Sequence, residues 1–151
     1  MWYDDCLPST HNTNWFNRNG LSTEYSSNGL KLTGGANSGN YMPNKDGTAT
    51  SIQDVTEWIP SFVFEFDIID FSSAGNISVG ISTVGRSLSQ LGINGATHLR
   101  IVYDGNTVKY YKDNSTTETY SANLTTSPVY INIGVGSGYN ITIKDVKIYP
   151  I

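Results

Sequence analysis

The sequence predicts an all-β domain, a two-sheet antiparallel jelly-roll sandwich with no substantial helix. Short runs in which apolar and polar residues alternate recur along the chain, and tight-turn dipeptides such as Asn-Gly and Asp-Gly separate them. No window sustains the 3.6-residue period of an amphipathic helix. Charged residues are only 15% of the 151 residues, and Gly, Asn, Ser and Thr fill the intervals. Many short strands divided by turns are typical of a sandwich or barrel.

The runs predicted as strands are, in chain order, residues 29–35, 40–42, 61–70, 76–83, 99–104, 129–136 and 140–151. Within 61–70 the alternation places four apolar side chains on one face: Phe62, Phe64, Phe66 and Ile68. Within 140–151 the alternation changes parity between Ile143 and Val146, which predicts a β-bulge near Lys144 and Asp145. Residues 87–93 predict one helical turn at most.

Residues 98–114, HLRIVYDGNTVKYYKDN, predict a β-hairpin. Asp104-Gly105 lies between two strand-like runs, and glycine accepts the positive φ that a tight hairpin turn requires. The alternation then directs one set of side chains into the core: Leu99, Ile101, Tyr103 and Val108. It directs a second set outward: Arg100, Lys109 and Tyr111.

Several segments resemble the concanavalin A-like jelly rolls, in the style of laminin-G domains, pentraxins and carbohydrate-binding modules: LRIVYDGNTVKYYKDN, SFVFEFDII, ITIKDVKIYPI and NWFNRNGLSTEYSSNGLKLTGG. The resemblance covers nearly the whole chain, and it implies one jelly-roll domain over residues 1–151. Domains of this kind occur in phage tail and baseplate proteins, in surface adhesins and as sugar-binding appendages of glycosidases. The resemblance therefore implies an extracellular, cell-surface or virion location, with surface glycans as partners. Met1 directly before the strand-like Trp2-Tyr3 favours a domain cut from a longer parent chain, whose other domains would be further partners.

Composition argues against several other classes of function. The net charge is -4 with only 9 Lys and Arg, which argues against nucleic acid as a partner. No apolar run approaches the roughly 20 residues that cross a bilayer, so we expect no membrane insertion. The one cysteine, Cys6, excludes an intramolecular disulfide, and with two histidines it is too little for a four-coordinate Cys/His metal site. His11 and His98 have no plausible nucleophile beside them.

Carbohydrate binding is favoured by the abundance of Tyr, Asn, Ser and Gly, because an aromatic face and directional hydrogen bonds together hold a sugar ring. The candidate platforms are the aromatic residues outside the alternating core: Tyr41, Trp58, Tyr111 and Tyr139. Arg100 and Asn132 could supply polar partners if their strands are neighbours on one concave sheet.

The carboxylates of residues 65–70, Glu65, Asp67 and Asp70, offer a catalytic alternative. Some glycoside hydrolases on this fold carry E-x-D-x-x-E on one strand, with a bulge that brings the third carboxylate to the same face. Glu65 and Asp67 fit that pattern, but the third position here is the shorter aspartate. A retaining mechanism needs two carboxyl groups about 5–5.5 Å apart.

We therefore predict a non-catalytic carbohydrate-binding domain, without a cofactor and without metal ligands. The carboxylates Asp46, Asp54 and Glu57 are the nearest approach to a calcium cluster and form no clear site. A purely structural or assembly domain of a virion or cell-surface protein is the first alternative. A small glycoside hydrolase that uses Glu65 and Asp67 is the second.

Overall fold

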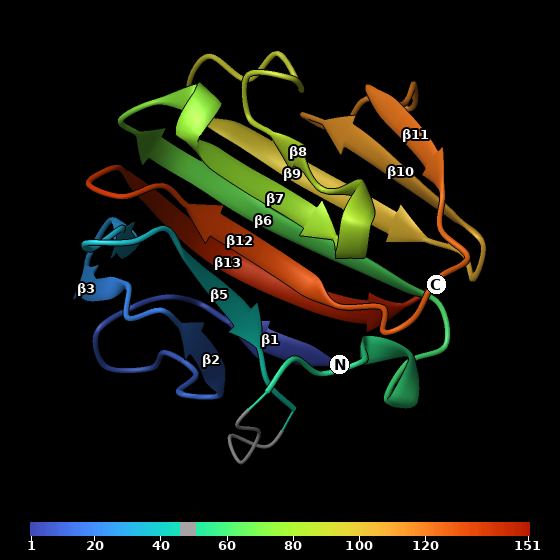
Figure 1. The fold of residues 1–151 in the computed structure, drawn as a ribbon, viewed down its shortest axis with the longest axis horizontal. Coiled ribbons are helices and arrows are strands. Elements are labelled where there is room, and N and C mark those ends of the chain that lie inside the picture. The colour runs from blue at the N-terminus through green and yellow to red at the C-terminus, as the bar shows by residue number, and fades with distance from the viewer. Residues whose placement is uncertain (46–50) are drawn as a thin grey trace.

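A computed structural model describes residues 1–45 and 51–151 and shows two antiparallel sheets packed face to face (Figure 1). The larger sheet has eight strands: β1 (Trp2–Asp4), β3 (Ser22–Ser26), β4 (Gly29–Thr33), β6 (Phe62–Phe71), β9 (Thr97–Tyr103), β10 (Thr107–Lys112), β11 (Tyr120–Asn123) and β13 (Asn140–Pro150). The smaller sheet has five: β2 (Trp15–Arg18), β5 (Gly39–Pro43), β7 (Ile77–Ile81), β8 (Arg86–Ser87) and β12 (Ile131–Val135). The predicted two-sheet jelly-roll sandwich is confirmed.

The strand order is β11-β10-β9-β6-β13-β4-β3 in the larger sheet, with β1 also paired to β13, and β2-β5-β12-β7-β8 in the smaller one. Helical structure in the described part of the chain consists of single 3-10 turns: η1 (Val55–Glu57), η2 (Ala74–Asn76) and η3 (Ser82–Val84). Among the described residues, no helix has the length and apolar character needed to cross a membrane. The expectation of no substantial helix is also confirmed.

Strand β13 is the spine of the larger sheet, because it pairs with β6 on one side and with both β4 and β1 on the other. Its register against β6 shifts between Lys144 and Lys147, and Asp145 has a φ of 50°. This is the predicted bulge. It returns Val146 and Ile148 to the buried face after the change of parity.

Strands β9 and β10 form the predicted hairpin, with Tyr103 opposite Val108. Gly105 has a φ of 100°. The Asp104 Oδ1 atom accepts hydrogen bonds from the backbone N–H groups of Asn106 at 2.9 Å and Thr107 at 2.7 Å. These bonds close the turn as an Asx-turn does.

The core lies between the two sheets and is dominated by the inward faces of β6, β9, β12 and β13. Tyr110 of β10 extends through it and donates a hydrogen bond from its hydroxyl to the Val84 carbonyl at 2.8 Å, near the smaller sheet. The hydroxyl occupies the space where a side chain at Gly80 would lie, and Gly80 has a φ of 142°. A residue with a Cβ would be excluded there both by space and by backbone conformation.

The N-terminal segment is tied to the core through the buried carboxylate of Asp4, which is 1% exposed. Its Oδ1 accepts hydrogen bonds from the backbone N–H groups of Cys6 at 2.8 Å and Asn12 at 2.9 Å. Its Oδ2 accepts one from Trp15 Nε1 at 2.7 Å. Cys6 is itself fully buried, and burial raises the pKa of its thiol, so it is a structural residue rather than a reactive one.

Candidate functional site

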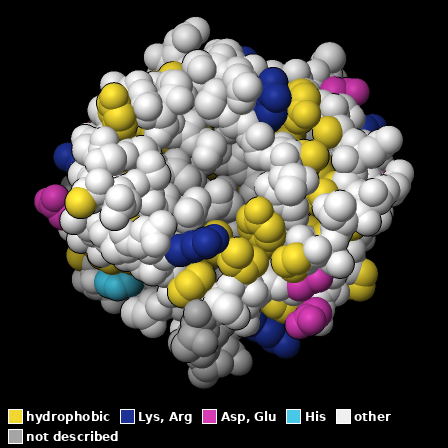
Figure 2. All heavy atoms as spheres, in the orientation of Figure 1, with side chains coloured by type: hydrophobic (Ala, Val, Ile, Leu, Met, Phe, Trp, Pro, Cys, Tyr) yellow, Lys and Arg dark blue, Asp and Glu magenta, His cyan; other side chains and the backbone are white. Residues whose placement is uncertain are grey.

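The outer face of the five-stranded sheet carries a depression of about 300 Å³, here called the front groove. Figure 2 views this face and shows it hollowed near the middle, with mostly uncharged polar and backbone atoms around the hollow. The lining residues used below are Asn40, Asn76, Ser78, Ser87, Gly134 and Gly136. Four of them lie on strands: Asn40 on β5, Ser78 on β7, Ser87 on β8 and Gly134 on β12. Asn76 directly precedes β7, and Gly136 directly follows β12.

Strand register brings a row of small or polar side chains across the whole sheet. Arg18 of β2 is opposite Asn40 of β5, and Asn40 is opposite Gly134 of β12. Gly134 is opposite Ser78 of β7, and Ser78 is opposite Ser87 of β8. Directly opposed residues on antiparallel strands share a face, with Cβ atoms about 4.5–5.5 Å apart. The row is therefore continuous from one edge of the sheet to the other.

Gly134 keeps the centre of the row low. A Cβ added there would lie 2.6 Å from Ser78 Oγ, 3.3 Å from Asn40 Oδ1 and 3.6 Å from Asn132 Nδ2. Polar atoms of three side chains thus converge over one glycine. The Asn132 Oδ1 atom is buried and accepts no hydrogen bond from the described residues. The centre of the groove thus brings together the Asn132 amide nitrogen, the Asn40 amide oxygen and the Ser78 hydroxyl. These are donors and acceptors of the kind that can hydrogen-bond to sugar hydroxyls.

Tyr139 lies beside the end of the front groove. A Cβ added at Gly136 would lie 3.0 Å from Tyr139 Cδ2 and 3.0 Å from the Asn76 carbonyl oxygen. The side chain of Tyr139 is among the most exposed large apolar ones in the described chain, at 37%. The groove thus has an aromatic ring at one end and polar groups along its length. Two of the residues predicted from the sequence, Tyr139 and Asn132, adjoin the same groove.

Arg100 and Tyr111 lie on the other side of the molecule, on the outer face of the larger sheet. They are opposite each other on β9 and β10, and the guanidinium carbon of Arg100 is 4.3 Å from the centroid of the Tyr111 ring. Because Arg100 and Asn132 belong to different sheets, the expectation that they share one sugar site is incorrect. The Arg100 guanidinium thus covers one face of the Tyr111 ring.

Tyr41 and Trp58 are also placed differently from the expectation that they lie outside the core. Tyr41 is only 7% exposed, and its ring stacks on Trp15 with centroids 4.5 Å apart. Trp58 is partly buried against the core and lines a small hollow with Trp2 and Ile59. For Tyr41 the reason is the two-sidedness of β5, which turns Asn40 outward and Tyr41 inward.

The carboxylates of β6 lie on the outer face of the larger sheet. Ile68 is opposite Ile143 and Asp70 is opposite Thr142, so Ile69 is an extra residue between them. This bulge places Asp70 on the same face as Glu65 and Asp67, as the catalytic alternative requires.

His98 occupies the space between two of these carboxylates. Its Nδ1 is 2.6 Å from Asp67 Oδ1, and its Nε2 is 3.7 Å from Glu65 Oε2. Glu65 Oε2 also accepts a hydrogen bond from the Tyr149 hydroxyl at 3.0 Å. Burial and this bond raise the pKa of the Tyr149 phenol. Glu65 and Asp67 are therefore held by neighbouring side chains of the same sheet face. Neither carboxylate lines the front groove.

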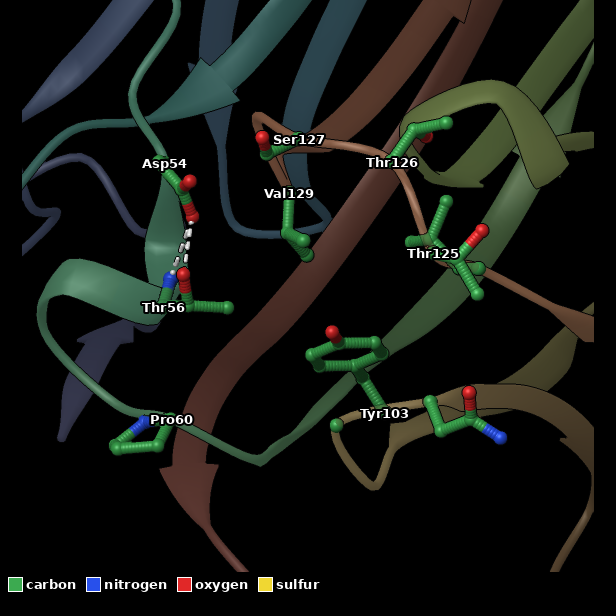
Figure 3. A pocket seen from close by; sticks show the side chains of 11 residues that line it. Asp54, Thr56, Pro60, Tyr103, Thr125, Thr126, Ser127 and Val129 are labelled. Atoms are coloured by element: carbon green, nitrogen blue, oxygen red, sulfur yellow. Dashed lines mark hydrogen bonds between the residues drawn. The ribbon is translucent and has the colours of Figure 1, made fainter.

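A second depression, the edge cup, has a volume of about 480 Å³ and lies between η1, the β9–β10 turn and the segment before β12 (Figure 3). The ring of Tyr103 lies at its floor, and the side chains of Thr125 and Ser127 line the opposite wall. The Asp54 carboxylate accepts bonds from Thr56 N at 3.0 Å and Thr56 Oγ1 at 2.6 Å. Burial and the nearby Asp54 and Asp104 carboxylates raise the pKa of Tyr103, so its hydroxyl stays protonated.

Asp54 of the edge cup is also one of the three carboxylates closest to a calcium cluster in the sequence. Asp46 lies outside the described residues, and Asp54 is engaged with Thr56 at the start of η1. Within residues 1–45 and 51–151 there is no group of three or more His, Cys, Asp or Glu side chains that could hold a metal ion.

Comparison with known proteins gives similarity in structure alone. No protein family model matches the chain, and no curated protein matches it by sequence. The carbohydrate binding module CBM66 from Bacillus subtilis is similar with a TM-score of 0.59 at 11% identity, over 90% of this chain and 95% of that one. The Bacillus licheniformis beta-glucanase has a TM-score of 0.60 at 11% identity, over 99% and 97%.

The exoplasmic/lumenal domain of VIP36, solved with Ca²⁺ and Man3GlcNAc bound, has a TM-score of 0.56 at 8% identity, over 97% of this chain and 88% of that one. These likenesses agree with the two-sheet sandwich. The fold of the chain is a concanavalin A-like jelly roll.

Sequence reasoning did not single out Asn40, Ser78 or Gly134 as site residues. A signal was present, since Ser78 and Gly134 occupy the outward positions of the predicted strands 76–83 and 129–136. A small or polar residue at the outward position of two strands indicates a low, hydrophilic surface. That these two positions belong to one groove follows only from the pairing of β7 with β12.

Proposed function

We propose that this domain binds glycans on the outer face of its five-stranded sheet and does not cleave them. The observation that carries the proposal is the front groove: a polar row across five strands with Gly134 at its centre. Sugar hydroxyls are recognised by directional donors and acceptors, and the amides of Asn40 and Asn132 and the hydroxyl of Ser78 supply both. Tyr139 at one end adds an aromatic surface for a sugar ring.

The similar structures support a carbohydrate ligand in general terms, since their names record a carbohydrate binding module, a glucanase and a domain with Man3GlcNAc. The setting that we propose is the outer surface of a cell or virus particle, where the domain would be one part of a longer chain. A low charge density and a surface rich in Asn, Ser and Thr suit that setting.

The test is a glycan array screened with and without calcium, using the native domain and the Gly134→Ala variant. The backbone of Gly134 does not have a positive φ, so alanine is conformationally acceptable, and its methyl group would displace Ser78 Oγ. Losing about two hydrogen bonds to the ligand should weaken binding by about tenfold or more.

Gly95→Ala is the matched control, because a Cβ at Gly95 would meet nothing within 4 Å. Binding that falls in Gly134→Ala and persists in Gly95→Ala supports the front groove. Equal binding by both variants would move the site elsewhere, with the edge cup next to be tested. No binding by a folded sample would favour the structural or assembly role.

The catalytic alternative has one observation in its favour, the bulge at Ile69 that aligns Asp70 with Glu65 and Asp67. Against it, His98 and Tyr149 already bind the two carboxylates. Incubation with β-glucans, with Glu65→Gln as control, tests it directly. Release of reducing ends that is abolished in Glu65→Gln would overturn the non-catalytic proposal.

A further inference from the structure

The front groove has an uncharged lining and a cation at its edge. None of its described lining residues is acidic or basic. Arg18 adjoins it, since Arg18 points outward from β2 directly opposite Asn40, which lines the groove. The groove is therefore neutral along its length and positive at one side.

Arg18 has no counter-ion among the described residues. The ion pairs found there join His98 to Glu65 and to Asp67, on the far sheet. The chain has 13 Asp and Glu and a net charge of -4, yet no described carboxylate comes within ion-pair distance of this exposed guanidinium. A guanidinium in this state is available to an external anion, and its planar fork can bind a carboxylate through two parallel hydrogen bonds.

Phe16 adds an apolar surface next to this cation. It lies two residues before Arg18 on β2 and therefore on the same outward face, opposite Met42. Phe16 and Arg18 line a depression of about 370 Å³ together with Ser51 and Ile52. A sugar ring over Phe16 would place a ring substituent within reach of Arg18, while the rest of the chain continues past Asn40 into the front groove.

We infer that the front groove selects anionic glycans, with Arg18 binding the carboxylate or sulfate of a sugar unit and Phe16 packing against its ring. The inference rests on the proposed function, and it adds the chemical class of the ligand. A neutral glycan would leave Arg18 solvated and would gain nothing from it. An anionic glycan gains a charge-assisted hydrogen bond, which is stronger than a neutral one.

The experiment uses an array of matched pairs: oligouronides with their methyl esters, sialylated glycans with their methyl esters, and sulfated glycans with their desulfated forms. We expect the native domain to bind anionic members at least about tenfold more tightly than their neutral partners at low salt. The preference should shrink as the salt concentration rises. The pairs that show the preference identify the anion as a carboxylate or a sulfate.

Arg18→Gln should abolish the preference and leave weak binding of the neutral partners. Lys31→Gln is the matched control, because it removes one positive charge from an exposed side chain on the opposite sheet. Equal binding of both members of every pair, or a preference that survives Arg18→Gln, overturns the inference while the proposed function stands. A preference lost equally in Lys31→Gln shows a general charge effect and also overturns it. No binding to any glycan by a folded sample overturns both proposals.

Discussion

Replacing Gly80 with alanine should destabilise the fold strongly, because this glycine gives room to a tyrosine from the other sheet. An alanine Cβ would overlap the Tyr110 hydroxyl and would lie 2.8 Å from Gly85 Cα. Overpacking of this kind costs about 1–3 kcal/mol. Displacing the hydroxyl from Val84 costs about 0.5–1.5 kcal/mol more, and alanine at a φ of 142° adds a further conformational cost of about 1 kcal/mol. The expected loss is about 3–5 kcal/mol in the free energy of unfolding.

Urea unfolding followed by the fluorescence of the three tryptophans measures this loss, with Gly95→Ala as the control. Tyr110→Phe alone should cost about 1 kcal/mol, since it removes the bond to Val84 and little else. The double variant Gly80→Ala/Tyr110→Phe should be more stable than the sum of the single losses predicts, by about 1 kcal/mol or more, because the overlapping oxygen is absent. A loss below about 1 kcal/mol for Gly80→Ala, or strict additivity in the double variant, would refute the reasoning.

Two further changes test the N-terminal segment and the hairpin turn. Asp4→Ala should lower the free energy of unfolding by about 3 kcal/mol, measured in the same urea titration, because it leaves one buried and two partly buried N–H donors without an acceptor. A change within about 1 kcal/mol would contradict this role. Hydrogen bonds from Thr107 and Asn106 hold the pKa of Asp104 below its ordinary value of 3.8. The Asp104 carboxylate therefore stabilises the fold at pH values above 3.8, and this stabilisation is lost as the pH falls through the lowered pKa. Native protein should therefore exceed Asp104→Asn in stability at pH 7, by less than about 1 kcal/mol for so exposed a group. The two should converge once the pH falls below the lowered pKa of Asp104, and a difference that persists there would be against the charge as its cause.

The sequence predicts best those features that depend on neighbours along the chain. The hairpin of 98–114 is local, because its turn residues and both alternating runs lie within one segment. The bulge in β13 is likewise visible, since a change of parity needs no knowledge of the partner strand. The short edge strands β8 and β11 escape prediction, because two to four polar residues carry no measurable alternation and are ordered by the strand beside them.

The front groove could not be assembled from the sequence, because its residues come from strands far apart in the chain. Asn40 and Gly134 are opposite each other although they are separated by most of the sequence, and their pairing is fixed by how the whole sandwich packs. The sequence interpretation suggested one site for Arg100 and Asn132 for the same reason, because strand neighbours cannot be derived from the sequence. Periodicity shows correctly that both point outward, but it cannot show that they point outward from different sheets.

The pairing of β1 with the end of β13 determines how the domain would respond to a pulling force. Trp2 is opposite Ile148 and the two strands run antiparallel, so both chain ends lie at the same end of this strand pair (Figure 1). Tension applied through the two ends would act across these strands rather than along them. The hydrogen bonds between β1 and β13 would then break one pair after another, starting at the chain ends. The buried Trp2 and the hydrogen-bonded carboxylate of Asp4 would resist further separation of the strands.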